Sequence, residues 1–341
     1  MPDIKVLVAG ANPVMRMRLV KAIRSNAGLR FIGEASDLPE TYTRAEALEP
    51  DVVLIARELT LPGEFTLMKA LFRALNSHWI TIDHRSTGVA NAGRPNAGND
   101  GALPAIDTAL PPDEICRQII AAGRLEPRQI VPGNRVPLPV AALQPGKIIL
   151  IGSSTGGVDA LLAVLSALPA DCPPVALVQH TGQSFSESLI RLLDRRCAVN
   201  VVAARDGMDI HPGLVCAAAG SPGHLRLKPG RPLRASLEAG PLISGHMPSV
   251  DALFRSAVPF ASQVVAVLLT GMGRDGAEGL LDLRRAGAVT IGQDQATSVV
   301  YGMPRAAWEL GAVQHQVGLG EIAATVLRAC AVKSEERRVI S

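Results

Sequence analysis

The segment that most constrains the fold is residues 147–165, where an apolar strand turns sharply into a helix. Residues 147–151 are mostly aliphatic and β-branched, as in a buried strand, and residues 158–165 have helical periodicity. The turn between them satisfies the G-x-S-x-G pattern, with Gly152, Ser154 and Gly156. That pattern holds a serine exposed on a strand-to-helix turn. It predicts an α/β domain with the Ser154 hydroxyl at the mouth of its sheet.

Two other interpretations of the same turn stay open at this point. Gly152 and Gly157 have the spacing of a phosphate-binding loop, although Val158 stands where that loop needs a lysine. The small residues are also compatible with a turn that only packs a helix on a strand. The local sequence alone does not decide among the three.

Length and composition predict two domains with aliphatic cores. The 341 residues exceed the usual length of one domain, and 48% of them are hydrophobic against 19% charged. Aromatic residues make up only 3%, so the cores must be built from Ala, Val and Leu. A net charge of +3, with arginines scattered and not interleaved with aromatics, gives no reason to expect a nucleic-acid surface.

Cysteine usage and hydropathy predict a cytoplasmic protein. The five cysteines are odd in number and form no C-x-x-C pair, so we expect reduced thiols, with neither a disulfide framework nor a metal site. The N-terminus has no apolar signal region, and no stretch approaches the ~20 apolar residues that span a bilayer.

The first 123 residues predict a doubly wound domain of the flavodoxin-like sort. Strands expected at 4–9, 29–35, 51–56, 79–83 and 103–107 alternate with helices at 15–25, 42–48, 65–75 and 112–124. A proline-rich linker follows at 124–146, then a second domain at 147–332 and a charged tail at 333–341. The strand and helix order of the first domain resembles a response-regulator receiver.

The residues that depart from the receiver pattern are those that carry its chemistry. Gly10 and Ala11 stand where receivers have an acidic pair that binds magnesium, and Ala56 stands at the phosphate-accepting aspartate. Pro111 aligns with the lysine that follows the fifth strand. Glycine and alanine offer no oxygen ligand to Mg²⁺, and alanine cannot form an acyl phosphate. We therefore expect a pseudo-receiver that is not phosphorylated.

In the second domain, three expected strands end near polar groups of complementary chemistry. The first leads to Ser154, the strand expected at 174–180 ends at His180, and the strand expected at 264–270 leads to Asp275. Sites in open α/β sheets form beyond the carboxyl ends of the strands, and a serine nucleophile needs a base held by an acceptor. The order Ser, His, Asp differs from that of α/β-hydrolases. Turn signals across 206–227 favour β-hairpins over βαβ units.

Some of these residues have plainer interpretations. Asp275, followed by Gly276, could cap its own helix. The remaining histidines are treated as surface or hydrogen-bonding residues, with one exception. His246 lies in a polar segment before a helix and either lines the site or caps the turn.

Five motifs together closely resemble the catalytic domain of the chemotaxis protein-glutamate methylesterases, the CheB family. They are IGSSTGG (151–157), QH (179–180), HMPSVD (246–251), LTGMGRDGA (269–277) and YGMPRA (301–306). The resemblance implies that Ser154 is the nucleophile, His180 the base and Asp275 the orienting acid. It also implies that backbone N–H groups near Thr155 and Met272 form the oxyanion hole.

The implied reaction is hydrolysis of glutamyl γ-methyl esters on the cytoplasmic helices of chemoreceptors, and deamidation of some glutamines there. It needs no metal or organic cofactor. The implied partners are methylated receptors and a chemosensory histidine kinase or adaptor, without nucleic acid or membrane insertion. The competing hypotheses are a non-enzymatic pseudo-receiver adaptor and a hydrolase of the same fold acting on another protein ester or amide.

Overall fold

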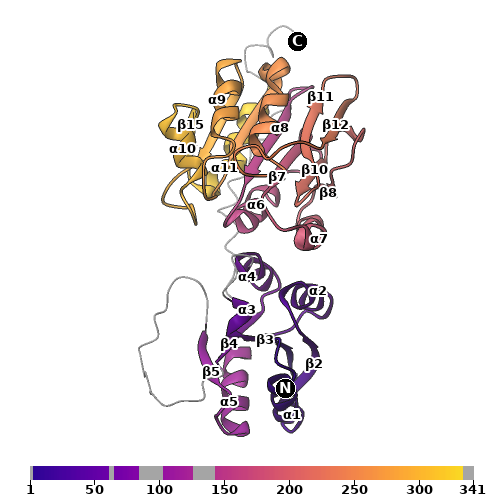
Figure 1. The fold of residues 1–341 in the computed structure, drawn as a ribbon. Helices are drawn as coiled ribbons and strands as arrows, with labels where there is room; N and C mark the ends of the chain where they lie inside the picture. The colour runs from indigo at the N-terminus through magenta and orange to yellow at the C-terminus, as the bar shows by residue number, and fades with distance from the viewer. Residues whose placement is uncertain (1–2, 61–64, 84–102, 126–142, 333–341) are drawn as a thin grey trace. The chain divides into compact units, whose positions relative to one another are not determined.

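The computed structural model describes residues 3–60, 65–83, 103–125 and 143–332 (Figure 1). Contacts divide the chain into two compact units, Met1–Ile130 and Val131–Ser341. Most of the expected linker 124–146 and all of the tail 333–341 lie outside the described residues. In the described part of the chain, no helix is long and apolar enough to cross a membrane.

The first unit is built on a five-stranded parallel sheet in the order β2-β1-β3-β4-β5. This is the flavodoxin-like order, which confirms the expected fold. The central strand β3 is buried at every residue, as its unbroken apolar sequence requires. The strands are β1 (Ile4–Ala9), β2 (Leu29–Ala35), β3 (Val52–Ala56), β4 (His78–Asp83) and β5 (Leu103–Asp107).

The predicted helices of this unit are present, with one clear difference in bounds, and the short helix α3 was not predicted. They are α1 (Pro13–Arg24), α2 (Leu38–Leu48), α3 (Arg57–Thr60), α4 (Phe65–Ala74) and α5 (Pro112–Gly123). Helix α2 begins four residues before the predicted start at Tyr42, because Asp37 caps it by accepting from the backbone of Glu40 at 2.8 Å. The prediction overlooked this acidic cap and the proline that follows in the first turn.

The second unit is a seven-stranded parallel sheet in the order β15-β14-β13-β6-β7-β10-β8. Helices α8, α9 and α10 pack on one face, and α6, α7 and α11 cover the other (Figure 1). The strands are β6 (Ile148–Ser153), β7 (Val175–Gln179), β8 (Asn200–Ala203), β10 (Leu214–Ala219), β13 (Val264–Leu268), β14 (Val289–Gln293) and β15 (His315–Val317). The helices are α6 (Gly157–Leu165), α7 (Ser186–Arg196), α8 (Val250–Ser256), α9 (Ala277–Arg285), α10 (Met303–Glu309) and α11 (Leu319–Cys330).

The predicted hairpin region is confirmed, but its extent was wrong. A small antiparallel sheet contains β9 (Asp209–Ile210), β11 (His224–Lys228) and β12 (Leu233–Glu238). Strand β10 lies within the predicted hairpin range, yet it pairs in parallel between β7 and β8 and is buried throughout. Its apolar run, without alternation, is the mark of a central strand that the turn signals around it obscured.

All five cysteines are free, and four of them are buried while Cys197 is half-buried.

Candidate active site

Ser154 occupies the turn between β6 and α6, at the carboxyl edge of the parallel sheet. Its backbone N–H donates to the carbonyl of Thr270 at 3.0 Å, and its carbonyl accepts from Gly157 at 2.8 Å. A Cβ at Gly271 would lie 2.7 Å from the Ser154 Cβ, so only glycine permits this approach of the two loops. The turn that follows β13 is thereby held against the serine.

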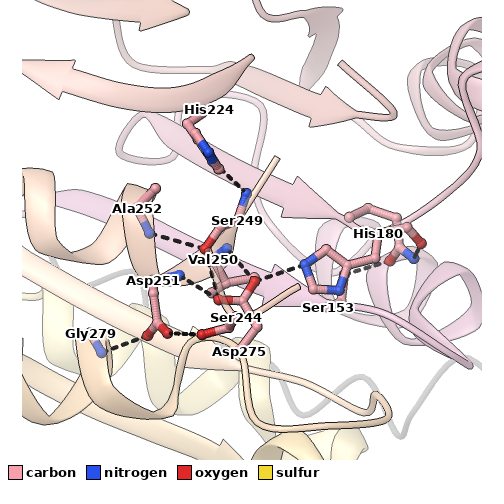
Figure 2. Close-up of polar contacts among 11 residues, drawn as sticks. Ser153, His180, His224, Ser244, Ser249, Val250, Asp251, Ala252, Asp275 and Gly279 are labelled. Atoms are coloured by element: carbon pink, nitrogen blue, oxygen red, sulfur yellow. Dashed lines mark hydrogen bonds and ion pairs between the residues drawn. The ribbon is translucent and has the colours of Figure 1, made fainter. Parts of the chain in front are cut away.

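His180 and Asp275 are brought together at the same edge. His180 directly follows β7, a neighbour of β6, and its Nε2 donates to Asp275 Oδ2 at 2.9 Å (Figure 2). The other ring nitrogen of His180, Nδ1, is buried and has no hydrogen-bond partner among the described residues. With a proton on Nε2, Nδ1 carries the lone pair that can accept another proton. The geometry thus leaves the ring ready to act as a base on the side away from Asp275.

Asp275 is fully buried and accepts hydrogen bonds from four groups. Besides His180, the donors are the Ser249 hydroxyl at 2.8 Å and the N–H groups of Val250 at 2.7 Å and Asp251 at 3.1 Å (Figure 2). Burial raises the pKa of Asp275, but these hydrogen bonds outweigh burial and hold that pKa below its usual range. Asp275 therefore presents a carboxylate to His180.

The sequence suggested that Asp275 could cap the helix that follows it, α9, and this was wrong. Gly276 caps the following helix, α9, without any side-chain hydrogen bond. Asp275 binds instead to the first turn of α8, where free N–H groups favour a negative charge.

A network that sequence reasoning missed supports this carboxylate from behind. The N–H of Ser249 donates to His224 Nδ1 at 3.2 Å, and His224 Nε2 bonds the carbonyl of Pro241 at 2.9 Å. Asp251 accepts from the N–H of Gly279 at 2.7 Å and from the Ser244 hydroxyl at 3.0 Å (Figure 2). Its pKa is raised by burial in the first place and by the nearby Asp275. The segment before α8 is consequently tied to both β11 and α9.

Gln179 links the two loops that carry the serine and the histidine. Its side-chain oxygen accepts from the Ser153 hydroxyl at 2.6 Å, and its amide donates to the carbonyls of Ser154 at 2.9 Å and His180 at 2.8 Å. The sequence identified Gln179 only as part of a motif, because no local pattern indicates that its side chain bridges these two loops.

His246 lies against His180 in the candidate site. Its ring stacks on that of His180 with centroids 3.7 Å apart and planes 8° from parallel. Burial lowers the pKa of His246, the nearby His180 lowers it further, and Asp275 partly opposes both. Of the two roles that the sequence left open, the structure thus supports a place in the site.

Two backbone N–H groups, one next to Ser154 in the chain and one in the loop after β13, have no hydrogen-bond acceptor among the described residues. None of the hydrogen bonds among the described residues uses the N–H of Thr155 or of Met272. The Thr270 hydroxyl donates to the Thr155 carbonyl at 2.9 Å, and the N–H of Gly271 donates to Val300 at 3.1 Å, so both loops are anchored. Fixed, unused donors of this kind are what stabilises a tetrahedral intermediate.

In the first unit, the space between the ends of β1 and β3 is filled by an apolar side chain. Gly10 directly follows β1, and Ala56 ends the neighbouring β3. A Cβ at Gly10 would lie 2.8 Å from the Ala56 Cβ and 2.3 Å from the terminal methyl of Met15. Met15 is itself buried, so this region holds hydrocarbon where a receiver holds carboxylates.

The residues at this edge do not fit a magnesium ion. Gly10 and Ala11 have no side-chain oxygen, and their carbonyls accept from the Arg16 guanidinium at 2.5 Å and 3.1 Å. Glu58 brings one carboxylate, whose oxygen lies 3.8 Å from the Cβ position at Gly10. Magnesium prefers several oxygens in octahedral geometry, and here a fixed cation already faces the available carbonyls.

The structure also locates the residue that follows β5. Thr108, not Pro111, comes directly after that strand, and it is buried. Pro111 lies three residues further along and precedes the first turn of α5. Neither position supplies the lysine of a receiver.

Comparison with known proteins identifies the family. The family model described as CheB methylesterase matches residues 149–326. A protein from Caulobacter vibrioides named protein-glutamate methylesterase/protein-glutamine glutaminase 1 is 37% identical over 96% of this chain and 98% of its own length. The chain belongs to the CheB methylesterase family. It is therefore an enzyme, a hydrolase of esters.

Other relatives extend this likeness. An Agrobacterium fabrum protein named protein-glutamate methylesterase/protein-glutamine glutaminase is 35% identical, over 97% of this chain and 98% of its own length. The crystal structure of the Thermotoga maritima CheB methylesterase catalytic domain aligns with a TM-score of 0.52 and 34% identity. That alignment covers 54% of this chain and 99% of the Thermotoga domain. The family assignment and the α/β fold of the second unit agree.

Proposed function

We propose that this CheB-family enzyme hydrolyses γ-methyl esters of glutamates on the cytoplasmic helices of chemoreceptors, and that it deamidates selected glutamines there. The observation that carries the proposal is the state of His180, whose Nε2 is held by Asp275 while Nδ1 stays unpaired. A base so oriented, on the strand next to the Ser154 turn, is what serine acyl transfer requires. The names of the relatives from Caulobacter and Agrobacterium supply the substrate class.

The mechanism follows from which nitrogen faces Asp275. Nδ1 of His180 takes the Ser154 proton as the serine oxygen attacks the ester carbonyl, and the imidazolium that forms is stabilised by Asp275. The oxyanion is bound by the N–H groups of Thr155 and Met272, each such donor being worth about 3 kcal/mol of the barrier. His180 then gives the proton to the leaving methoxide, and water repeats the cycle on the acyl-enzyme.

Exposed apolar side chains beside the serine turn support a protein-borne substrate. Met272 is 70% exposed and adjoins the Gly271 contact with Ser154. Val299, 62% exposed, packs over Gly156, where a Cβ would lie 2.5 Å from it. Exposed apolar surface of this kind suits contact with the side of a helix.

The proposed function is tested by measuring methanol release from a methylated receptor fragment. Wild-type enzyme should release methanol, and Ser154→Ala should not. Release that persists in Ser154→Ala would overturn the serine mechanism. An enzyme that is folded but inactive, yet binds receptor or kinase, would favour the adaptor hypothesis instead.

We further propose that aspartyl phosphorylation does not control this enzyme. The apolar surroundings of Gly10, where a Cβ would meet both Met15 and Ala56, and the Arg16 cation at the adjacent carbonyls support this proposal. Incubation with acetyl phosphate and Mg²⁺ should leave the chain unmodified and its activity unchanged. A stoichiometric, acid-labile phosphoprotein would refute it. If the chain is not phosphorylated, its activity would be controlled by a binding partner, such as a chemosensory kinase or an adaptor.

A further inference from the structure

We infer that His246 is a positioning residue for the general base. Its stacked ring holds the His180 imidazole in the orientation in which Nε2 bonds Asp275 and Nδ1 stays free to accept a proton. This inference rests on the proposed function, in which His180 takes the proton of Ser154. It assigns His246 a role of its own in the reaction, beyond membership of a sequence motif.

The hydrogen bonds of His180 do not by themselves fix its ring. The ring makes one hydrogen bond, Nε2 to Asp275, and the described residues give Nδ1 none. Rotation about the axis of a single hydrogen bond is soft, and the terminal torsion of histidine is broad. A flat surface 3.7 Å away and 8° from parallel removes that freedom on one face. Such a stack orients the base without using either of its nitrogens.

His246 can serve as this surface because its own segment is rigid. His246 and Ile243 exchange backbone hydrogen bonds of 2.9 Å and 3.1 Å, which close a tight turn. The Ser244 hydroxyl within the turn donates to Asp251 at 3.0 Å, and Asp251 accepts from Gly279 at 2.7 Å. The ring is therefore carried on a turn fastened to α8 and α9, as preorganised sites require.

The charges around His246 require that its ring stay neutral during the reaction. The titratable groups that face this region are His180 after β7, Asp275 before α9, Asp251 on α8 and His224 on β11. When His180 takes the serine proton, a protonated His246 would place a second cation face to face with it. Burial and His180 lower the pKa of His246, which favours the neutral ring. A neutral aromatic face is compatible with the imidazolium.

Two substitutions in the full chain separate stacking from other roles. His246→Phe keeps a flat ring and cannot titrate, while His246→Ala removes the surface. We expect His246→Ala to lower kcat between about twofold and about tenfold, as for the loss of one aromatic contact, with KM unchanged. His246→Phe should keep kcat near the wild-type value, and its activity should lose one ionisation step at low pH. The assay is methanol release from methylated receptor fragment across pH, with urea unfolding to confirm that both variants fold.

An equal loss in His246→Phe and His246→Ala would overturn the inference, since it would show that a ring nitrogen is needed. A change in KM alone would also overturn it, by indicating a contact with substrate.

A second measurement does not depend on enzymatic activity. The ring protons of His180 should carry an upfield NMR shift from the stacked ring, retained in His246→Phe and lost in His246→Ala. An unchanged His180 spectrum in His246→Ala would refute the stack itself. If wild-type enzyme released no methanol while these shifts behaved as expected, the proposed function would fail and the positioning geometry would stand.

Discussion

Replacing Asp275 by asparagine tests the charge of the orienting carboxylate with its shape retained. Asp275 Oδ2 accepts from His180 and Val250, whereas Oδ1 accepts from Ser249 and Asp251. An asparagine has one acceptor oxygen and one NH₂ group, so one pair of donors must face the NH₂. The consequence depends on which pair that is.

The two orientations of the amide are not equivalent. With its oxygen at the Oδ2 position, the amide keeps the bonds from His180 and from Val250, the latter 2.7 Å in the wild type. Its NH₂ then donates to the Ser249 hydroxyl, which can accept, and only the 3.1 Å bond from Asp251 is lost. The opposite orientation leaves the N–H of Val250 unpaired and forces Nε2 of His180 to accept. We therefore expect the first orientation, in which His180 keeps its proton on Nε2.

The loss of kcat in Asp275→Asn then comes from the lost negative charge and not from a change in the His180 tautomer. A carboxylate and an imidazolium about 4 Å apart attract by about 4 kcal/mol at an effective dielectric constant of about 20. At about 1.4 kcal/mol per factor of ten, kcat should fall about a thousandfold. The unpaired N–H of Asp251 should lower the free energy of unfolding by about 1 to 3 kcal/mol.

The assay is methanol release at saturating substrate, paired with urea unfolding. Asp251→Asn is the matched control, because its amide oxygen can accept from Gly279 and its NH₂ can donate to Ser244. Burial raises the pKa of Asp251, so that losing its charge should cost little, and both kcat and stability should stay near wild type. A loss below tenfold in Asp275→Asn would refute the electrostatic role, and an equal loss in the control would make the effect a general one of this region.

Three further predictions concern close contacts and pH. Gly271→Ala should lower kcat by about a hundredfold, since its Cβ would displace the nucleophile by clashing with Ser154, and wild-type kcat would contradict that reasoning. Ala56→Asp should still take up no phosphate from acetyl phosphate and Mg²⁺, because Met15 fills the adjoining space; an acid-labile phosphoprotein in that variant would show the space to be open. As the pH is lowered below 6.5, the free energy of unfolding should decrease more steeply in wild type than in His246→Phe. The lowered pKa means that the unfolded chain binds the proton of His246 first, and parallel curves in urea titrations at several pH values would contradict this.

Much of the fold follows from local patterns. Unbroken apolar runs such as 264–268 identify central parallel strands, and their alternation with helices defines the doubly wound class. Local patterns gave the wrong prediction where the position of a strand in the sheet depends on which strands it pairs with. Strand β10 was assigned to a hairpin because the turns around it are real, whereas its place in the sheet depends on pairing with β7, about 40 residues earlier in the chain, and with β8. The sequence prediction also assigned no helix to 303–309 or 319–330, although both form one.

The sequence by itself determined the chemistry available to this protein. The residues at 154, 180 and 275 indicate a serine hydrolase, and those at 10, 11 and 56 are not the residue types with which a receiver binds magnesium and accepts phosphate. Those conclusions depend only on residue type and spacing, which are fixed by the sequence before the chain folds.

Only the tertiary structure decided how those groups are oriented. It decided that Asp275 binds the first turn of α8, that Nε2 and not Nδ1 of His180 faces it, and that His246 stacks on that ring. The physical reason is that hydrogen-bond direction and ring stacking act over 3 to 4 Å between residues that are 95 and 66 positions apart in the chain. No local pattern in a sequence specifies such a contact. What remains of the receiver pattern shows the same division, since its lost carboxylates are visible in the sequence and the methionine that fills their place is visible only in the fold.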